Sequence, residues 1–218
     1  LGQYEDSDKF MNQYLLLAPS QQRSILLKSE KNYINLIKQN SDRFELRTLK
    51  INSPNSDFGG SFYNDQLVFS SSRESNNIYK RTHSWTGLPF TSLFSGIITS
   101  DGLVSDAKKF AKNIDSKFNE STPVFTKDGN TVYFTRNNFI KGKKGQNSEG
   151  TVFLKIYRAQ KNQKQEWDNI TELPFNSDNF QVAHPALSPD ERTLYFASDR
   201  PGTIGKSDIY RVEIKPNG

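Results

Sequence analysis

The amino-acid sequence predicts a mainly β fold with a short α-helical segment before it, and three observations support this prediction. Only 33% of the 218 residues are hydrophobic, yet 12% are aromatic, a mixture that suits strands with one buried face. Thirteen Gly and nine Pro supply turns at short intervals. A motif rich in strand-forming residues also recurs along the chain. Many short strands are therefore expected, rather than a few long helices.

Two helices are expected in residues 1–40, which we predict to be a separate segment. Apolar residues recur at helical spacing on both sides of Pro19. Proline ends the first helix because it lacks an amide donor, and Ser20 can cap the second helix. The helix before Pro19 resembles the second helix of a tetratricopeptide repeat (TPR). An ordinary helical cap on a β domain is the alternative, since such repeats need stacked neighbours.

Three copies of one motif are visible in residues 41–218. Each copy has a β-prone run with a central Phe, and Phe69, Phe134 and Phe196 lie 65 and 62 positions apart. A turn of the type Lys-Asp-Gly or Ser-Pro-Asp precedes this run in the second and third copies. An Ile-Tyr pair that begins the next strand follows at Ile78-Tyr79, Ile156-Tyr157 and Ile209-Tyr210.

Each copy is expected to form about four strands, which would make it one blade of a β-propeller. Runs such as 194–197 are almost continuously apolar, as in strands covered on both faces. Outer strands are expected near Trp85 and Trp167, each of which precedes a Leu-Pro-Phe sequence. Propellers commonly close with about four to eight blades. We therefore expect a partial propeller that continues beyond Gly218, and we expect residues 44–49 to supply an outer strand to a blade completed elsewhere.

The third copy resembles the repeat of TolB-type, WD40-like propellers. The resemblance rests on Ser188-Pro189-Asp190, Leu194-Tyr195-Phe196-Ala197-Ser198-Asp199-Arg200 and Asp208-Ile209-Tyr210-Arg211. The second copy keeps the Asp-Gly turn and the Tyr-Phe and Ile-Tyr pairs, whereas the first copy is shorter at its turn. This resemblance implies a partial TolB-type propeller over residues 41–218.

Together with the helices, the layout resembles Bacteroidota envelope proteins of the OmpA family, which join TPR repeats, this propeller and a peptidoglycan-binding OmpA-like domain. The stretches 55–59 and 133–138 are similar to that group, and the PorE-like proteins of type IX secretion and gliding motility are the nearest members. The resemblance implies a periplasmic scaffold, associated with the outer membrane, that binds other envelope proteins. It would tether an outer-membrane complex to peptidoglycan through a domain outside this chain.

No catalytic constellation is visible in the sequence. There is no Gly-x-Ser-x-Gly nucleophile elbow and no cysteine. His83 and His184 lie far apart without ligands at metal-binding spacing; we expect His184 to be buried in a structural role and His83 to lie on a solvated turn. Asp199, Arg200 and Asp208 are expected to fasten turns. We therefore predict a non-enzymatic protein without cofactor or metal.

A Gly- and Lys-rich stretch after the second central strand is predicted to be a long surface loop. Its residues Lys141, Lys143 and Lys144, with Asn137 and Asn138 before them, form a candidate partner-contact loop. Rigid propellers present their variable loops at the two faces, which is where partners bind. A merely solvated loop is the alternative.

Two other classes of partner are not expected. The net charge is +5, but 24 acidic residues are interleaved with 29 basic ones, and the basic stripe of a nucleic-acid-binding surface is missing. No apolar run approaches the roughly 18 residues of a membrane span. The alternative function is a carbohydrate-binding or carbohydrate-processing propeller, in which Trp85 and Trp167 would stack on sugars.

Overall fold

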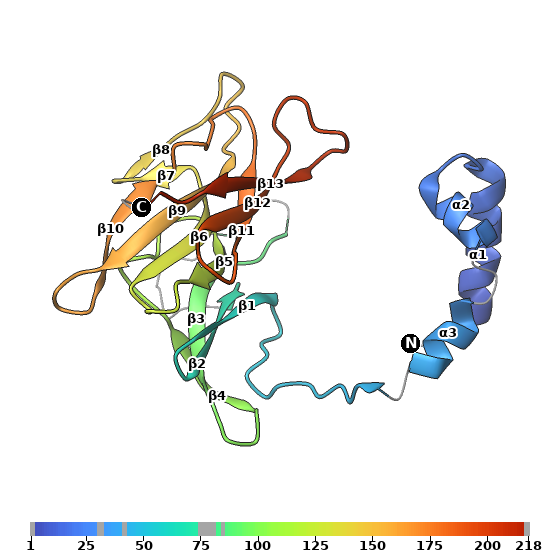
Figure 1. The fold of residues 1–218 in the computed structure, drawn as a ribbon, viewed down its shortest axis with the longest axis horizontal. Coiled ribbons are helices and arrows are strands. Elements are labelled where there is room, and N and C mark those ends of the chain that lie inside the picture. Colours follow the sequence, from blue (N-terminus) through green and yellow to red (C-terminus); the bar gives the residue numbers. More distant parts are fainter. Residues whose placement is uncertain (1–2, 30–32, 41–42, 74–81, 84–85, 216–218) are drawn as a thin grey trace. The chain divides into compact units, whose positions relative to one another are not determined.

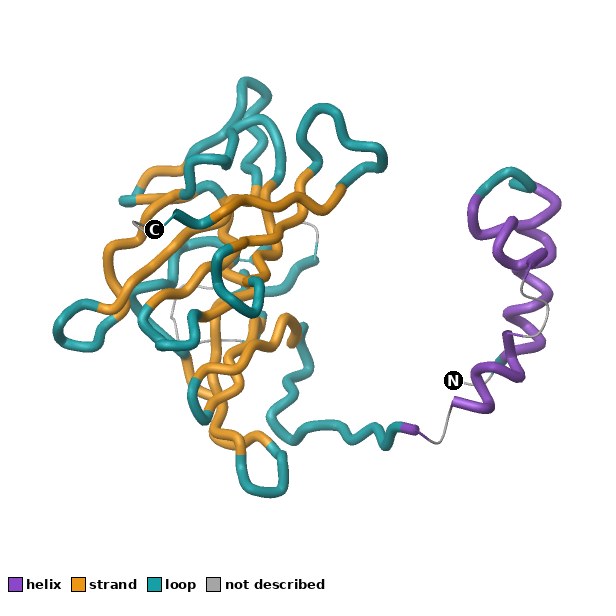
Figure 2. The backbone as a smooth tube through the Cα atoms, viewed as in Figure 1, coloured by secondary structure: helices purple, strands orange, loops and turns teal. Residues whose placement is uncertain are grey.

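The computed structural model of the protein describes residues 3–29, 33–40, 43–73, 82–83 and 86–215. The chain divides into two compact units, and the division lies between Thr48 and Leu49. The first unit contains helices and the second contains strands (Figures 1 and 2). The protein is therefore mainly β, with several antiparallel sheets, as the composition predicts.

Three helices form in the first unit, α1 (Tyr4–Leu17), α2 (Gln22–Ser29) and α3 (Tyr33–Asn40). The break near Pro19 is confirmed, but the expected second helix is two helices. The polar contact across the break also differs from the prediction. Ser24, which is buried in α2, donates its hydroxyl to the carbonyl of Ala18 at 2.7 Å, whereas Ser20 is exposed. None of the described helices is long and apolar enough to cross a membrane.

Three antiparallel sheets and one small hairpin form the second unit (Figure 1). Sheet 1 has the order β1-β2-β3-β4, sheet 2 the order β5-β6-β9-β10 and sheet 3 the order β11-β12-β13, while β7 pairs only with β8. The strands are β1 (Asp57–Tyr63), β2 (Gln66–Ser71), β3 (Ser92–Ile98), β4 (Val104–Lys109), β5 (Glu120–Phe125), β6 (Thr131–Asn137), β7 (Phe139–Ile140), β8 (Lys143–Lys144), β9 (Leu154–Lys161), β10 (Trp167–Glu172), β11 (Val182–Leu187), β12 (Thr193–Ser198) and β13 (Asp208–Glu213). The predicted unit of about four strands is confirmed in sheets 1 and 2, and sheet 3 has three described strands.

The central Phe of each copy lies in the second strand of its sheet, directly opposite an aromatic residue of the third strand. The pairs are Phe69 with Phe94, Phe134 with Tyr157, and Phe196 with Tyr210. The prediction that the Ile-Tyr pair lies in the third strand is therefore confirmed for the second and third copies. For the first copy it is not tested, because Ile78-Tyr79 lies outside the described residues; the third described strand of sheet 1 is β3.

The outer strands follow the prediction in one sheet and not in another. In sheet 2 the outer strand is β10, which begins at Trp167 as expected. In sheet 1 it is β4, so the expected outer strand near Trp85 is wrong. That stretch lies between β2 and β3, where Thr82 and Pro89 form an isolated bridge, and Trp85 itself lies outside the described residues. A Leu-Pro-Phe sequence therefore does not identify an outer strand by itself.

Sheet 2 is buried on both faces. Val132 and Phe134 of β6 pack in the apolar cluster shared with sheet 1, whereas Tyr133 packs in the cluster shared with sheet 3. Alternate side chains of a strand point to opposite faces, so a strand buried on both faces needs a continuous apolar run. The sequence prediction is confirmed for this strand. In sheet 3, by contrast, Tyr195 is 39% exposed.

Each sheet has a bulge in its first strand, and in sheets 2 and 3 this bulge binds the preceding sheet. Gly59, Thr122 and His184 occupy equivalent bulge positions and have φ values of 65°, 45° and 58°. The bulge turns the backbone amide toward the preceding sheet. Thr122 donates its amide to the hydroxyl of Ser70 at 3.0 Å, and His184 donates to the hydroxyl of Thr135 at 2.9 Å. Both sheet interfaces thus use the same hydrogen bond.

Candidate functional site

The lysine-rich stretch, which was predicted to be a long surface loop, lies at the surface and contains a tight hairpin. The two-residue strands β7 and β8 pair, and Lys141 and Gly142 connect them with φ values of 49° and 80°. Positive φ at both central residues is the pattern of a type I′ turn, whose twist matches that of the flanking strands. The side chains of Lys141, Lys143 and Lys144 are all exposed. We call these three residues the lysine hairpin.

Asn138 anchors the lysine hairpin from beneath, where only 5% of the residue is exposed. Its carbonyl accepts the amide of Gly145 at 2.8 Å, and its side-chain amide donates to Asp178 at 2.6 Å. A Cβ atom at Gly145 would collide with that side-chain amide. Asn137 is also engaged, because its oxygen accepts two hydrogen bonds from Asn119 at 3.1 and 3.0 Å. The side chains of both asparagines are thus engaged within the fold, whereas the three lysine side chains are exposed.

The ammonium groups of the lysine hairpin form no ion pair with any acid in the described part of the chain. Asp178, at the base of the hairpin, is already paired with Lys155 at 2.6 Å. The hydrogen bond from Lys155 lowers the pKa of Asp178, so this carboxylate stays charged and engaged. Three uncompensated cations on a fixed turn can attract an acidic surface.

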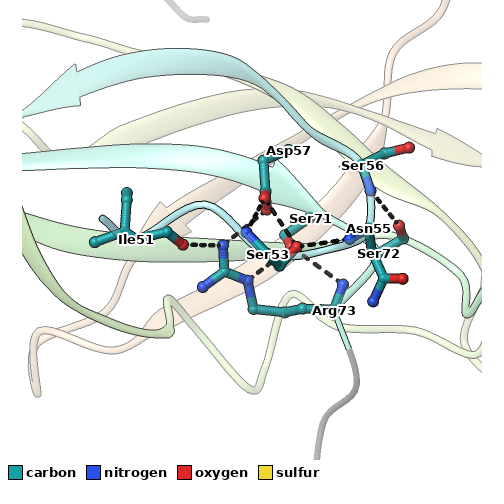
Figure 3. Close-up of polar contacts among 8 residues, drawn as sticks. All are labelled: Ile51, Ser53, Asn55, Ser56, Asp57, Ser71, Ser72 and Arg73. Atoms are coloured by element: carbon teal, nitrogen blue, oxygen red, sulfur yellow. Dashed lines mark hydrogen bonds and ion pairs between the residues drawn. The ribbon is translucent and has the colours of Figure 1, made fainter. Parts of the chain in front are cut away.

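An arginine fastens each sheet to the segment that precedes it, and Figure 3 shows this link in sheet 1. Nη2 of Arg73 donates to the carboxylate of Asp57 at 2.7 Å and to the carbonyl of Ile51 at 2.8 Å. The guanidinium carbon lies 5.1 Å from the ring centroids of both Phe69 and Phe94, a cation–π distance. Burial raises the pKa of Asp57, but hydrogen bonds, first of all from Arg73, outweigh it and lower the pKa to about 2.

Arg136 makes the corresponding link in sheet 2. Its Nε donates to Glu120 at 3.0 Å, and its Nη2 donates to the carbonyl of Ile114. The guanidinium carbon lies 5.0 and 5.2 Å from the ring centroids of Phe134 and Tyr157. Glu120 is fully buried, and this burial, which the Arg136 charge offsets only in part, raises the pKa of Glu120 to about 7. The same link thus holds a carboxyl group that can be neutral near pH 7.

Arg200 makes the link in sheet 3, and no carboxylate among the described residues forms an ion pair with it. Its Nη2 donates to the carbonyl of Phe175 at 3.4 Å, and its Nε donates to the hydroxyl of Ser198 at 3.2 Å. The guanidinium carbon lies 5.1 and 4.7 Å from the ring centroids of Phe196 and Tyr210. The prediction that Arg200 has a structural role is confirmed.

The two acids near Arg200 also fasten the backbone. Asp199 accepts the amide of Gln181 at 2.6 Å. Asp208 accepts the amides of Ile204 and Gly205 at 2.6 and 3.2 Å. All three charged residues of the third copy therefore bind backbone groups, in agreement with the predicted role of fastening turns.

Sequence reasoning missed the carboxylates of the arginine links, although a signal was present. Asp57 and Glu120 each lie six positions after an isoleucine, at Ile51 and Ile114, and each isoleucine is followed two positions later by a serine. These segments differ in their remaining residues, and the acids are far in sequence from their arginines. Only the pairing of β1 with β2 and of β5 with β6 brings each acid beside its arginine.

The histidines do not form a site. The amide of His184 makes the bulge hydrogen bond, but its side chain is exposed, so the expected burial of the imidazole is wrong. His83 begins a turn, since its carbonyl accepts the amide of Gly87 at 2.9 Å, but it is half-buried, with its ring 5.8 Å from that of Phe90. No group of three or more potential ligands for a metal ion occurs among the residues that the structure describes.

Trp167 is not placed to stack on a sugar. It is 6% exposed and packs with Tyr63 and Phe125 at centroid distances of 5.8 and 5.9 Å. A pocket of about 400 Å³ borders this cluster, but the ammonium of Lys161 lies over the Trp167 ring at 5.6 Å. The carbohydrate alternative therefore loses Trp167, and Trp85 lies outside the described residues.

No protein-family model matches the chain, and no curated protein sequence matches it. Among solved structures, it is similar to a puromycin-hydrolyzing peptidase of Mycobacterium tuberculosis, with a TM-score of 0.41, 12% identity, and coverage of 78% of this chain and 24% of that chain. It is also similar to a puromycin hydrolase, with a TM-score of 0.39, 12% identity, and coverage of 74% and 31%. The chain thus spans about a quarter to a third of the length of these proteins. A likeness at this level does not transfer an activity.

Proposed function

We propose that the chain is part of a non-enzymatic scaffold of the bacterial envelope that binds other proteins through its lysine hairpin. The observation that carries the proposal is the arrangement of Lys141, Lys143 and Lys144. These three cations are exposed, lack acidic partners among the described residues and sit on a turn fixed by the buried Asn138. A preorganised charged surface loses little entropy on binding, so it suits a docking role.

The scaffold itself is proposed to be a set of TolB-type propeller blades. Its three sheets share the aromatic pair, the arginine link and the bulge in the first strand. The same amide-to-hydroxyl bond connects sheet 1 to sheet 2 and sheet 2 to sheet 3. Such repetition supports consecutive blades of one ring, which would present the connecting loops at its faces.

The cellular setting follows from the family resemblance. We propose a periplasmic location at the outer membrane, where the protein would tether a type IX secretion or gliding complex to peptidoglycan. The peptidoglycan contact would be made by an OmpA-like domain outside this chain. The partner of the lysine hairpin would be an envelope protein with an acidic surface, because its charge has to complement the three cations.

The non-enzymatic part of the proposal is supported by the roles of the charged groups in the described residues. Asp57, Glu120, Asp199 and Asp208 all bind backbone or arginine groups within the fold. A peptidase assay with puromycin as one substrate tests this part directly. Turnover that survives removal of contaminating activity would contradict it.

Affinity purification from gently solubilised envelopes tests the docking surface. We expect the triple substitution Lys141→Glu, Lys143→Glu and Lys144→Glu to abolish recovery of the partner, because repulsion replaces attraction. The matched control makes the same charge change at three other exposed lysines, Lys108, Lys164 and Lys206.

Equal partner recovery by both triple variants would overturn the role of the lysine hairpin. Recovery of no stable partner by the wild-type protein, at low as well as moderate salt, would count against a scaffold. Low salt is included because contacts between exposed charges weaken as ionic strength rises.

A further inference from the structure

The pocket of about 400 Å³ between sheets 1 and 2 shares no residue with the lysine hairpin. Three stretches of chain line it: Tyr63 and Gln66 at the turn between β1 and β2, residues 110–113 after β4, and residues 161 and 165–167 around the turn between β9 and β10. All of them belong to the second compact unit. The volume lies in the range of small-ligand sites, about 300 to 1,000 Å³. The fold therefore gathers distant residues around one cavity.

Three aromatic rings form one wall of this pocket and fix its shape. The ring centroid of Tyr63 lies 5.4 Å from that of Phe110 and 5.8 Å from that of Trp167, and the last two are 6.0 Å apart. Tyr63 and Trp167 are buried, whereas Phe110 is half-buried and keeps some accessible surface. Rings packed on one another lose little freedom when a ligand binds, so the wall is preorganised.

The ammonium group of Lys161 lies against the aromatic wall. It is 5.3 Å from the ring centroid of Tyr63 and 5.6 Å from that of Trp167. Both distances are within the roughly 6 Å at which a ring face attracts a cation. Lys161 is half-buried, unlike the fully exposed lysines of the lysine hairpin. The two rings therefore hold one positive charge at a defined place in the pocket.

The hydrogen-bonding capacity of this ammonium group is mostly unused within the described part of the chain. An ammonium group has three N–H donors. Nζ of Lys161 donates to Oε1 of Gln165 at 3.4 Å, which is longer than the usual range of about 2.7 to 3.2 Å. No carboxylate among the described residues forms an ion pair with Lys161. Lys161 therefore has donors left for the oxygen atoms of a ligand.

The charges of the lining favour an anion with a single negative charge. Lys112 and Lys161 are its cations and Glu166 is its acid, so the net charge is positive, and the side-chain amides of Gln66 and Asn113 add further donors. A phosphate monoester carries about 1.5 to 2 negative charges at pH 7 and is best held by the fork of an arginine. None of the described lining residues is an arginine. A carboxylate therefore suits the pocket better than a phosphate.

We propose that this pocket binds a carboxylate that carries an apolar group, with Lys161 as the ion-pair partner and Phe110 in contact with the apolar group. The C-terminus of a peptide and a free organic acid both present this chemistry. Because the ammonium group is half-buried, salt screens its attraction less than it screens a pair of fully exposed charges. This inference does not depend on the lysine hairpin.

Isothermal titration calorimetry with small probes tests the class of ligand. We expect N-acetylphenylalanine to bind at least about tenfold more tightly than its amide, because only the carboxylate forms a charge-assisted hydrogen bond with the ammonium group. Equal affinity for the amide, or tighter binding of phenyl phosphate, would overturn the proposal. A tripeptide that ends in phenylalanine with a free carboxylate separates the two sources. Binding of this tripeptide indicates a peptide C-terminus, whereas binding of N-acetylphenylalanine alone indicates a free acid.

Substitution of the lysines tests the ion pair. We expect Lys161→Met to raise the Kd of N-acetylphenylalanine at least about tenfold, because methionine fills the space over the rings but carries no charge. The matched control is Lys164→Met, an exposed residue of the same turn that does not line the pocket. Lys112→Met, at an exposed lining position, should raise the Kd about two- to threefold and provides a test that does not disturb the rings. Wild-type affinity in both Lys161→Met and Lys112→Met would contradict the proposal.

Discussion

Asp57 and Glu120 occupy the same position in two copies of one motif, yet their environments shift their pKa values in opposite directions. Each begins the first strand of its sheet and binds the arginine that covers the aromatic pair. Asp57 also accepts the amide and hydroxyl of Ser53, at 2.6 and 2.8 Å, so hydrogen bonds dominate and its pKa is about 2. Glu120 is fully buried, so desolvation dominates and its pKa is about 7. The balance between burial and hydrogen bonding therefore decides whether the pKa of the carboxyl group is raised or lowered.

The first prediction concerns Asp57. Its pKa is lower in the folded state than the ordinary value of 3.8, so its stabilising contribution is present above pH 3.8 and is lost as the pH falls toward about 2. We expect Asp57→Asn to lower the free energy of unfolding by about 2 kcal/mol at pH 7. The difference from wild type should shrink in acid. Urea unfolding at several pH values measures it, with Asp106→Asn, an exposed residue of the same sheet, as the control.

The second prediction concerns Glu120 and has the opposite sign. Its pKa is raised from 4.5 to about 7, so the folded state favours the protonated form, and stability is lost as the pH rises from about 4.5 through 7. We expect the free energy of unfolding of Glu120→Gln to decrease by about 1 to 3 kcal/mol less than that of wild type over this pH range. Asp115, whose pKa is also raised by burial, would leave a smaller slope of the same sign. An unchanged pH profile in urea unfolding would show that Glu120 is not the titrating group.

At the scale of the elements, the bulge of one sheet and a hydroxyl of the sheet before it form a recurring connection. Ser70 and Thr135 supply the hydroxyl in sheets 1 and 2, and each follows the central Phe of its strand. The corresponding residue of sheet 3 is Ala197, which has no hydroxyl. The side chain of Ala197 therefore cannot accept this hydrogen bond from a further sheet.

The third prediction tests this connection. Thr135→Val keeps the branched shape of the side chain but removes the hydroxyl that accepts the amide of His184. Residue 135 is fully buried, so water cannot replace that acceptor. We expect the free energy of unfolding to fall by about 1 to 3 kcal/mol, the cost of an unsatisfied buried donor. Hydrogen exchange at the His184 amide should accelerate as well. Thr193→Val, at a half-buried strand position, is the control, and an equal loss there would show a general effect of valine.

At the scale of the whole molecule, the three sheets differ in what covers them. Tyr133 of sheet 2 packs in the cluster shared with sheet 3 and is 5% exposed, whereas Tyr195, the equivalent residue of sheet 3, is 39% exposed. Both residues lie in second strands and both are aromatic, so their sequences predict the same surroundings. The position of the sheet in the stack makes the difference.

The fourth prediction uses this contrast. We expect Tyr133→Ala to cost about 3 to 5 kcal/mol, because it leaves a cavity between sheets 2 and 3. Tyr195→Ala should cost less than about 1 kcal/mol in dilute protein, where its face is open. Urea unfolding of both variants checks the values. A large cost at Tyr195 would mean that another sheet covers that face in solution.

The sequence by itself determined the local structure: the break at Pro19, the Asp-containing turns before β6 and β12, and the continuous apolar run of β6. These features depend on residues within a few positions of one another, where backbone propensity and side-chain period act directly. Only the tertiary structure showed that Arg136 lies over the aromatic pair of its sheet as Arg73 and Arg200 do in theirs. Arg136 follows the central Phe by two positions, whereas Arg73 and Arg200 follow it by four. The tertiary structure also showed that Glu120 is fully buried and that the buried Asn138 holds the lysine hairpin. Such outcomes depend on groups that are distant in sequence and become neighbours only when the strands pair and the sheets stack.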